Sequence, residues 1–364
     1  MRLFHSLHYT KVLKQTLTTL KLENIPKTKP TTPISYFGQR ELITPDLFRL
    51  LGNKKYNRLY DPFSGSGSIS FSAMKEGIAK EYFINDSYPT FKELWELIAS
   101  DPEKIIISYK NLVKQYLALP FEQRNKFYLN LLKDFNRRIP HDQKESAIHF
   151  VFIMNFSEKS IPIFDKNRSL TTEPNVLINK DLEEKRLINF KEVVLGLCDL
   201  FKSNKVNFCS GDFSETIRSA SHKDLVIFDP PYPEQDEKIY FNLKSESMLQ
   251  QHLKSAFEEL NKRNVDFCVL YGAGPIKKRN QFKGEELAVK HLVRLSHHSF
   301  FGYFLEHIYV SRNIHLIPHQ LPLSMAFYKD LFDSETEIPV TDYEHAIDLL
   351  KRKVENPNEV RLAI

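Results

Sequence analysis

The chain has 364 residues, of which 41% are hydrophobic and 27% are charged, a composition typical of a globular protein with room for one large and one smaller domain. Lysine and arginine exceed aspartate and glutamate by 51 − 46 = 5, a surplus that is compatible with a nucleic-acid partner without requiring one. No stretch approaches the ~20 consecutive apolar residues of a membrane span, so we expect no membrane partner.

Three cysteines, Cys198, Cys209 and Cys268, stand in apolar stretches without CxxC spacing. This odd number and irregular spacing predict buried free thiols in a reducing compartment, with neither a disulfide nor a zinc site. We therefore expect a cytoplasmic protein.

Residues 22–35 are rich in proline, threonine and lysine and predict an extended lead-in. From about residue 56, short apolar strands alternate with amphipathic helices, the pattern of a doubly wound, mostly parallel α/β sheet. In chain order these are YNRLYDPF, ISFSAMKEGIAK, EYFIND and TFKELWELIAS, then VNFCSGDF, DLVIFDPPY, a helix over 246–262 and VDFCVLYG. Two more strands, over 287–296 and 304–312, are joined by a short loop, which predicts an antiparallel edge strand.

Residues 101–204 interrupt this alternation. Apolar residues there recur at helical spacing, whereas HFVFIMNF near 149–156 fits either a buried helix or a strand. The segment is long for a crossover connection, so we expect a mainly helical insertion in a Rossmann-like sheet domain formed by residues 1–100 and 205–313. Residues 314–364 are a C-terminal extension with a helix near 342–353.

The tetrapeptide Asp229-Pro230-Pro231-Tyr232 follows the apolar strand DLVIF. Ligands of doubly wound sheets bind beyond the carboxyl ends of the strands, and consecutive prolines fix the backbone there. The turn presents a carboxylate and a carbonyl as paired acceptors beside an aromatic ring, which suits an amino group on a planar base that stacks on the ring. The alternative is a strand-terminating turn with an exposed Asp and Tyr.

A glycine turn, DPFSGSG at 61–67, ends the first strand of the alternation. Gly65 and Gly67 allow a tight turn and close approach of a ligand. The turn lacks the third glycine of a dinucleotide fingerprint, and the chain has no GxxxxGK loop, so a nucleoside cofactor without a pyrophosphate fits better than NAD or ATP. Asp86 ends the next strand, where an acid meets ribose hydroxyls, while Asp212 is either a helix cap or a cofactor contact.

In this order the motifs resemble the Dam-like, alpha-class adenine DNA methyltransferases over residues 36–313. YFGQREL at 36–42 resembles the family's N-terminal motif, DPFSGSGSISF its methionine-binding loop, FIND its ribose-binding strand end, GDF its adenine-binding turn and DPPY its catalytic motif. LQQHLKSAF resembles the helix that follows DPPY, and LEHIYVSRN at 305–313 the late strand, usually written with Glu and a terminal Asn. The long interval before DPPY matches the position of the family's target-recognition domain.

The resemblance implies a site-specific enzyme that transfers a methyl group from S-adenosyl-L-methionine to the N6 amino group of adenine in double-stranded DNA, without a metal. It also suggests a separate cognate restriction endonuclease as a partner. The implied catalytic residues are Asp229, Pro230, Pro231 and Tyr232. The implied cofactor-binding residues are Tyr36, Gly38, Arg40, Asp61, Pro62, Phe63, Gly65, Gly67, Asp86, Asp212 and Phe213.

The chain departs from the family pattern in two places. Gln39 and Arg40 replace the usual Gly-Lys of the N-terminal motif, and the recognition signature NxxxFNGxxR does not continue after Asn155. Cytosine-N4 methylation, an RNA substrate and a catalytically silent DNA-binding homologue stay open as alternatives. Basic side chains are candidates for contacts with phosphates or bases: Arg137, Arg138, Lys166 and Arg168.

Overall fold

The computed structural model describes residues 32–36, 40–52, 54–138, 143–157, 160, 162–165, 167, 169–174, 180–231, 246–273, 289–298, 302–316, 321–327 and 340–355. The chain divides into two compact units, Met1–Pro30 and Thr31–Ile364, and every element below belongs to the second. Several residues named above lie outside the described ones: Gly38, Gln39, Lys166, Arg168 and Tyr232.

One eight-stranded sheet organises the fold, in the order β3-β2-β1-β4-β5-β7-β6-β8. The first five strands of this order run parallel, which confirms the expected doubly wound, mostly parallel α/β sheet. The strand order reverses between β1 and β4, where Leu59 lies opposite Leu225. The strands are β1 Tyr56–Asp61, β2 Ala79–Asp86, β3 Lys205–Ser210, β4 Leu225–Phe228, β5 Asp266–Ala273, β6 Val289–His298, β7 Gly302–Ser311 and β8 Met325–Phe327.

The antiparallel strands form the far part of the sheet, in an order that the sequence pattern left open. The hairpin of β6 and β7 forms as expected, but β7 is inserted between β5 and β6, and the short β8 lies outermost. The composition of β7 explains its interior place, because Ile308 and Val310 are buried on one face and Tyr309 on the other, as in a strand covered on both sides.

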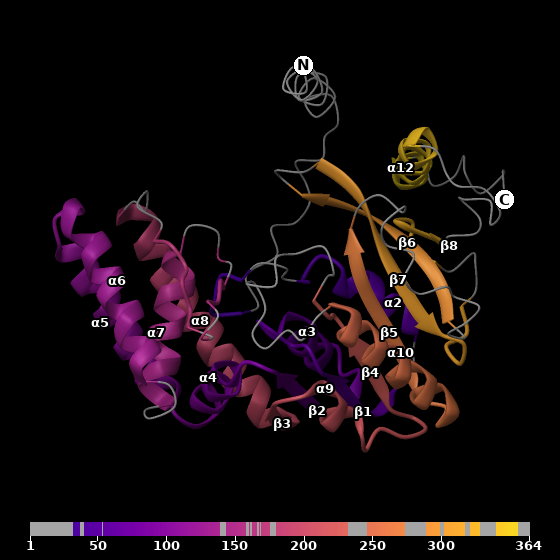
Figure 1. Cartoon of the computed structure of the whole chain (residues 1–364), viewed down its shortest axis with the longest axis horizontal. Helices are drawn as coiled ribbons and strands as arrows, with labels where there is room; N and C mark the ends of the chain where they lie inside the picture. The colour runs from indigo at the N-terminus through magenta and orange to yellow at the C-terminus, as the bar shows by residue number, and fades with distance from the viewer. Residues whose placement is uncertain are drawn as a thin grey trace. The chain divides into compact units, whose positions relative to one another are not determined.

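Helices cover both faces of the sheet (Figure 1). Alternate residues of β4 show this: Leu225 and Ile227 pack in one hydrophobic cluster, and Val226 and Phe228 in another. The first cluster contains side chains of α2 Thr44–Leu51, α3 Ser68–Lys75, α4 Pro89–Ser100 and α8 Lys180–Ser203; the second contains side chains of α9 Phe213–Ile217 and α10 Glu246–Lys262. A third, smaller cluster joins α12 Val340–Glu355 to β6 and β7.

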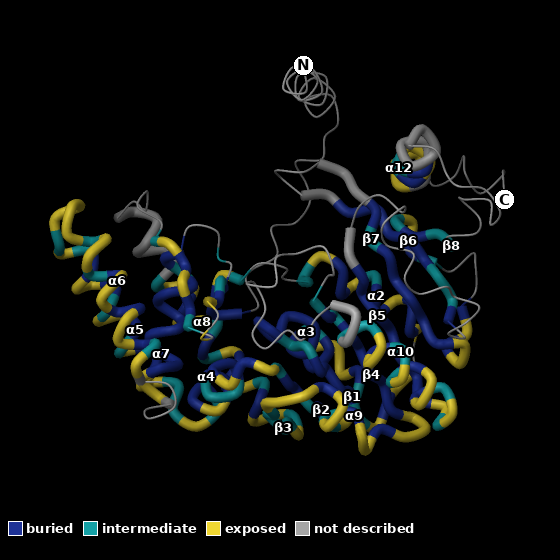
Figure 2. The backbone as a smooth tube through the Cα atoms, viewed as in Figure 1, coloured by how far each residue is buried: buried dark blue, intermediate teal, exposed yellow. Residues whose placement is uncertain are grey.

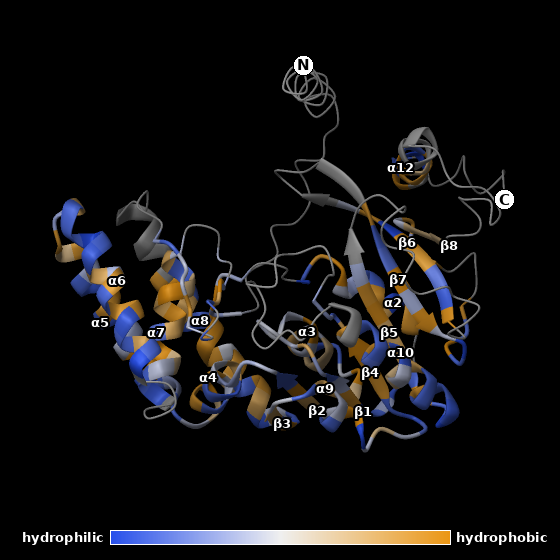
Figure 3. Ribbon diagram, viewed as in Figure 1, coloured by the Kyte–Doolittle hydropathy of each residue, from blue (hydrophilic) through white to orange (hydrophobic). Residues whose placement is uncertain are grey.

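Between α4 and α8 lie three more helices, α5 Pro102–Ala118, α6 Phe121–Arg138 and α7 Gln143–Phe156. The ambiguous HFVFIMNF stretch is therefore helical, and its residues 150–154 are fully buried. A helix that is covered all round carries no amphipathic period, and Figure 3 accordingly colours most of α7 as hydrophobic.

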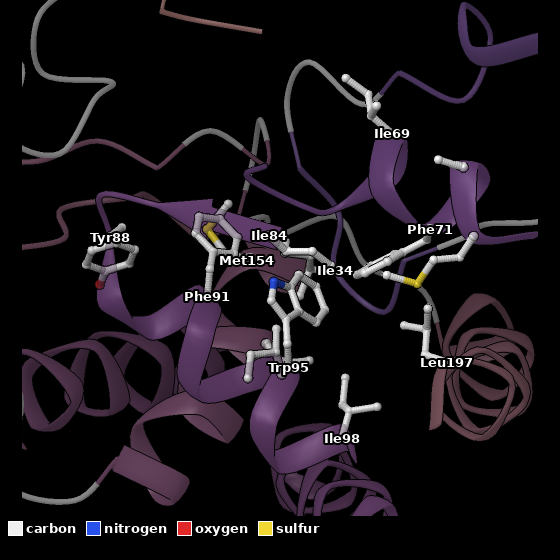
Figure 4. Close-up of a cluster of buried hydrophobic side chains, with 14 of the residues drawn as sticks. Ile34, Ile69, Phe71, Ile84, Tyr88, Phe91, Trp95, Ile98, Met154 and Leu197 are labelled. Carbon is white, nitrogen blue, oxygen red and sulfur yellow. The ribbon is translucent and has the colours of Figure 1, made fainter. Parts of the chain in front are cut away.

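The core is continuous from the sheet into these helices. Figure 4 shows Phe91 and Trp95 of α4 among Phe71 of α3, Met154 of α7 and Leu197 of α8. The Trp95 ring meets Phe71 edge to face, with centroids 5.0 Å apart. The division of the chain into a sheet domain and an insertion domain stays a prediction.

The three cysteines are free, and Cys198 and Cys268 are buried as expected, whereas Cys209 is only half-buried. None of the helices in the described part of the chain has the length and apolar character needed to cross a membrane. Within those same ranges no cluster of His, Cys, Asp and Glu could hold a metal ion.

Candidate active site

Three aspartates gather at the carboxyl ends of neighbouring parallel strands. Asp61 ends β1, Asp86 ends β2, and Asp229 directly follows β4, and these strands are adjacent in the sheet. Ligands of doubly wound sheets bind at this edge, where the strand order reverses. The three motifs that contain these aspartates therefore lie together at the expected ligand-binding edge.

The glycine turn after β1 has a backbone that only glycine tolerates well. Gly65 and Gly67 have φ of 48° and 76°, in the left-handed region that disfavours other residues. A Cβ on Gly67 would lie 2.3 Å from the Phe71 ring, and one on Gly65 would lie 3.1 Å from the Tyr36 ring. The N-terminal motif therefore reaches the glycine turn through Tyr36.

Asp86 holds this turn in place. One carboxylate oxygen accepts a hydrogen bond from the Gly65 N–H and the other accepts one from the Tyr88 N–H, both at 2.9 Å. Burial raises the pKa of Asp86 to about 6, although these backbone hydrogen bonds oppose the shift. Asp86 thus fixes both the glycine turn and the start of α4.

Asn85 joins the ends of three strands, a role that was not predicted from the sequence. Its side-chain amide donates to the Pro62 carbonyl at 3.0 Å and to the Gly211 carbonyl at 3.2 Å, and its own carbonyl accepts from the Ser64 N–H. An amide side chain directly after the apolar residues Phe83 and Ile84 was the available signal. The clamp keeps the loops after β1 and β3 together.

The loop after β3 contributes Phe213 and Asp212. The rings of Phe63 and Phe213 are in contact, with centroids 5.0 Å apart, so the aromatic residues of DPF and GDF meet. Asp212 caps α9, because its carboxylate accepts from the Ser214 N–H at 2.9 Å. The helix-cap interpretation of Asp212 is therefore confirmed, and a cofactor contact stays a prediction.

Asp61 is a fully buried carboxyl group with an incomplete set of partners. Its Oδ2 accepts from the Ser70 hydroxyl at 2.6 Å, while Oδ1 has no hydrogen-bond partner among the described residues. Burial, together with the charges of Asp229 and Asp86, raises the pKa of Asp61 to about 7, and the Ser70 hydrogen bond opposes the shift. A buried acceptor without a partner is costly and suits a cationic ligand.

Both carboxylate oxygens of Asp229 are bound by Arg40. The guanidinium donates from Nε to Oδ2 and from Nη2 to Oδ1, each at 2.7 Å, in the bidentate geometry of strong ion pairs. Burial raises the pKa of Asp229, whereas Arg40 lowers it. The backbone N–H of Arg40 also donates to the Ser68 hydroxyl. The guanidinium of Arg40 thus lies on Asp229, and a cofactor contact of Arg40 stays a prediction.

A second carboxylate shares Arg40. Nη1 of Arg40 donates to Glu306 at 3.1 Å, and Glu306 also pairs with Arg294, which in turn pairs with Asp46 of α2. Glu306 is the glutamate of LEHIYVSRN, and neither its ion pair with Arg40 nor the place of Arg294 could be predicted from that pattern. Cationic residues on a buried strand were the signal that could have identified Arg294.

Comparisons with known proteins agree on one kind of enzyme. The family model for D12 class N6 adenine-specific DNA methyltransferases matches residues 36–298. The chain is 22% identical over 245 residues to the type II methyltransferase M1.LlaDCHI of Lactococcus lactis subsp. cremoris, covering 66% of this chain and 80% of the relative.

Two further relatives are similar over parts of the chain. The type II methyltransferase M.MjaIII of Methanocaldococcus jannaschii is 24% identical over 242 residues, which are 62% of this chain and 80% of the relative. The retron Ec67 DNA adenine methylase of Escherichia coli is 23% identical over 175 residues, which are 48% of this chain and 55% of the relative.

Proposed function

The chain belongs to the D12 class N6 adenine-specific DNA methyltransferase family, and from this premise we propose a role for each residue at the carboxyl edge of the sheet. As a member of this family it methylates the N6 amino group of adenine in DNA, so the cytosine-N4 alternative loses its support. The main support for the proposed roles is the position of Asp229. It directly follows β4, which lies next to β1 at the point where the strand order reverses.

Asp229 and the Pro230 carbonyl accept the two hydrogens of the adenine amino group. Two acceptors weaken the delocalisation of the nitrogen lone pair into the ring and direct it towards an electrophile. The base must leave the duplex stack to reach this edge. Tyr232, which lies outside the described residues, stacks on the extruded base according to the sequence pattern, and Pro231 fixes the backbone between them.

The strand-end residues fit S-adenosyl-L-methionine as the methyl donor. The unpartnered Asp61 oxygen suits the ammonium group of its methionine part, and the left-handed turn at Gly65 and Gly67 lets a ligand approach the backbone. Asp86, at the end of the next strand, serves the ribose. The remaining proposed cofactor residues are Tyr36, Gly38, Arg40, Pro62, Phe63, Asp212 and Phe213.

When bound, S-adenosyl-L-methionine supplies the methyl carbon, whose bond to sulfur breaks with its electron pair going to sulfur while the N6 lone pair forms the new bond. The carboxylate of Asp229 stabilises the positive charge that develops on the amino nitrogen. It then accepts one of the nitrogen's protons through the hydrogen bond that the bound amino group donates to it, and passes this proton to water. Positioning and electrostatics are therefore the contributions of the protein.

DNA docks on the helical segment within 101–204. On α6, Lys126, Lys133 and Arg137 are exposed and follow one another by seven and four residues, so they share one face of the helix. Figure 2 shows the outer sides of α5 and α6 as largely exposed. Such a basic face suits the phosphates of double-stranded DNA, and the segment as a whole serves as the target-recognition domain.

We further propose that the chain is the methyltransferase of a restriction-modification pair. Two of the similar proteins are named type II methyltransferases, which favours a separate cognate restriction endonuclease as the functional partner of this chain. DNA isolated from cells that express the chain should then resist that endonuclease at the methylated sequence and carry methyladenine there.

The test of the residue roles is transfer of a labelled methyl group to duplex DNA, followed by identification of the modified nucleoside. We expect N6-methyladenine from the wild type and from Asp199→Ala, a control at an exposed aspartate of α8. Asp229→Ala should give no product and still bind S-adenosyl-L-methionine. An active Asp229→Ala variant would show that the catalytic assignment is wrong.

A further inference from the structure

A charge ladder, made of Asp229, Arg40, Glu306, Arg294 and Asp46, leads from the tip of β4 to α2. Each arginine bridges two carboxylates, with nitrogen–oxygen distances of 2.7 to 3.1 Å. All five side chains are only 10–18% exposed, so their charges are weakly screened by solvent. Asp229 lies at one end of the ladder. The other two carboxylates, Glu306 and Asp46, have no part in the catalytic steps proposed above.

Glu306 is the rigid centre of this ladder. It lies directly opposite Arg294 in the antiparallel pair of β6 and β7, and the Ser296 hydroxyl also donates to it. On its other side, the register of β5 and β7 shifts between Tyr271 and Ala273, where Ala273 faces Glu306. Strand β7 has neighbours on both sides, so the backbone leaves Glu306 little freedom to move.

The position of Glu306 addresses a conflict between the Arg40–Asp229 ion pair and the proposed methyl transfer. During transfer, positive charge develops on the amino nitrogen, which donates a hydrogen bond to Asp229. An arginine bound to both oxygens of Asp229 neutralises that carboxylate and occupies the acceptors which the amino group needs. Glu306 contacts the third nitrogen of the same guanidinium and offers it another anion within reach.

We propose that Glu306 is a positioning residue for methyl transfer, which draws Arg40 away from Asp229 so that the Asp229 carboxylate can accept the adenine amino group. This inference rests on the proposed role of Asp229. Arg294 pairs with Glu306 and holds it in place, whereas Asp46 contacts only the far side of Arg294.

The deciding variant is Glu306→Gln, which keeps the shape and one acceptor but removes the charge. The charged groups that face Asp229 are Arg40 from the segment before α2, Glu306 from β7 and Asp61 from β1. The Glu306 charge raises the pKa of Asp229 and Arg40 lowers it. Loss of the Glu306 charge should therefore lower the pKa of Asp229, because Arg40 is left to Asp229 alone.

That pKa is measurable in the cofactor-free protein by ¹³C NMR of labelled aspartate carboxyls, with Asp229→Asn identifying the signal. If Glu306 merely tethered Arg40, its loss would release Arg40 and the pKa of Asp229 would rise instead. An unchanged or raised pKa overturns the inference.

The same variant should slow single-turnover methyl transfer roughly tenfold or more, the scale of one charge near a reacting atom, with the dissociation constant of S-adenosyl-L-methionine changed less than about twofold. The matched control is Asp46→Asn, which removes one charge from the far end of the ladder. It should lower the melting temperature as Glu306→Gln does, yet leave the Asp229 pKa and the transfer rate near the wild type.

Equal losses of rate in the two variants would mean that the ladder acts through stability alone, and would overturn the inference. Failure of the proposed function is distinguishable from this, since it is decided by the activity of Asp229→Ala. The NMR titration of Glu306→Gln reports on Glu306 whatever that activity proves to be.

Discussion

The carboxyl edge of the sheet and the helices α5–α7 bury different kinds of side chain. At the edge, Asp61 and Asn85 are 0% and 1% exposed, and the ion pair of Arg40 and Asp229 lies close by. In the helices most of the fully buried side chains are aromatic or aliphatic, and Phe152 stacks on Phe156 with centroids 4.3 Å apart. The first region buries charge, and the second buries apolar rings.

This difference indicates what each region contributes. Burial of a carboxyl group costs free energy unless it is fully paired, and the raised pKa of Asp61 and of Asp86 records that cost. Stacked rings that are removed from water stabilise the fold. The helices therefore supply stability and an exposed basic face, while the edge gives up stability to bury the carboxyl groups of the proposed active site.

The largest expected effect is that of Gly67→Ala at the edge. A Cβ there would lie 2.3 Å from the Phe71 ring at a φ of 76°, so we expect a loss of about 2–4 kcal/mol of unfolding free energy. S-adenosyl-L-methionine binding should weaken by roughly 100-fold, because the turn must change its shape. Calorimetric titration and thermal unfolding measure the two effects.

The control for Gly67→Ala is Gly196→Ala in α8, where a Cβ would meet nothing within 4 Å. Since alanine favours helix over glycine, this variant should gain about 0.5–1 kcal/mol. If both alanine variants bound the cofactor equally well, the glycine turn would have no special part in binding.

Asp61→Asn should weaken cofactor binding at pH 8 by about tenfold or more, on the scale of a lost charged hydrogen bond. Its effect on stability should have the opposite sign. The folded-state pKa of Asp61, about 7, lies above the ordinary aspartate value, so ionisation of this group favours the unfolded chain, fully above pH 7 and progressively less below it. Asparagine should therefore raise the melting temperature at pH 8, with the gain shrinking below pH 7 and vanishing only below the ordinary aspartate pKa of about 4.

Asp224→Asn is the matched control for Asp61→Asn. Asp224 is equally buried but lies at the amino end of β4, where Arg58 donates to it at 2.7 Å. Removing its charge leaves Arg58 without that partner, so this variant should lose stability at pH 8 and bind the cofactor normally. A stabilised Asp224→Asn, or a destabilised Asp61→Asn, would remove the contrast between paired and unpaired carboxyls.

The smallest expected effect is on the helical side, with Lys133→Gln on the exposed face of α6. One lost phosphate contact should weaken DNA binding about fivefold and reduce the slope of log K against log salt by about 1. Cofactor binding and stability should not change. Lys80→Gln is the control, since Lys80 is exposed at the amino end of β2, away from the active edge. Equal effects of the two variants on DNA binding would place the DNA elsewhere.

Much of the fold and part of the site could be predicted from the sequence. The alternation of apolar strands and amphipathic helices gave the parallel sheet, and the motif order gave Asp61, Asp86 and Asp229 at neighbouring strand ends. The secondary structure of the HFVFIMNF stretch could not be predicted, because a helix that is buried on all sides shows no alternation of apolar and polar faces in its sequence. The short β8 escaped notice because its three residues carry no pattern.

The order of the motifs, the glycine turn and the polar tip of β4 each depend on residues that are neighbours along the chain, so they can be recognised in the amino-acid sequence. The partner of each charged group depends instead on how distant strands and helices are arranged in space. Arg40 meets Asp229 across 189 positions and Glu306 across 266 positions. A hydrogen bond spans only ~3 Å, so strand order and register choose its partner, and no local pattern records that choice.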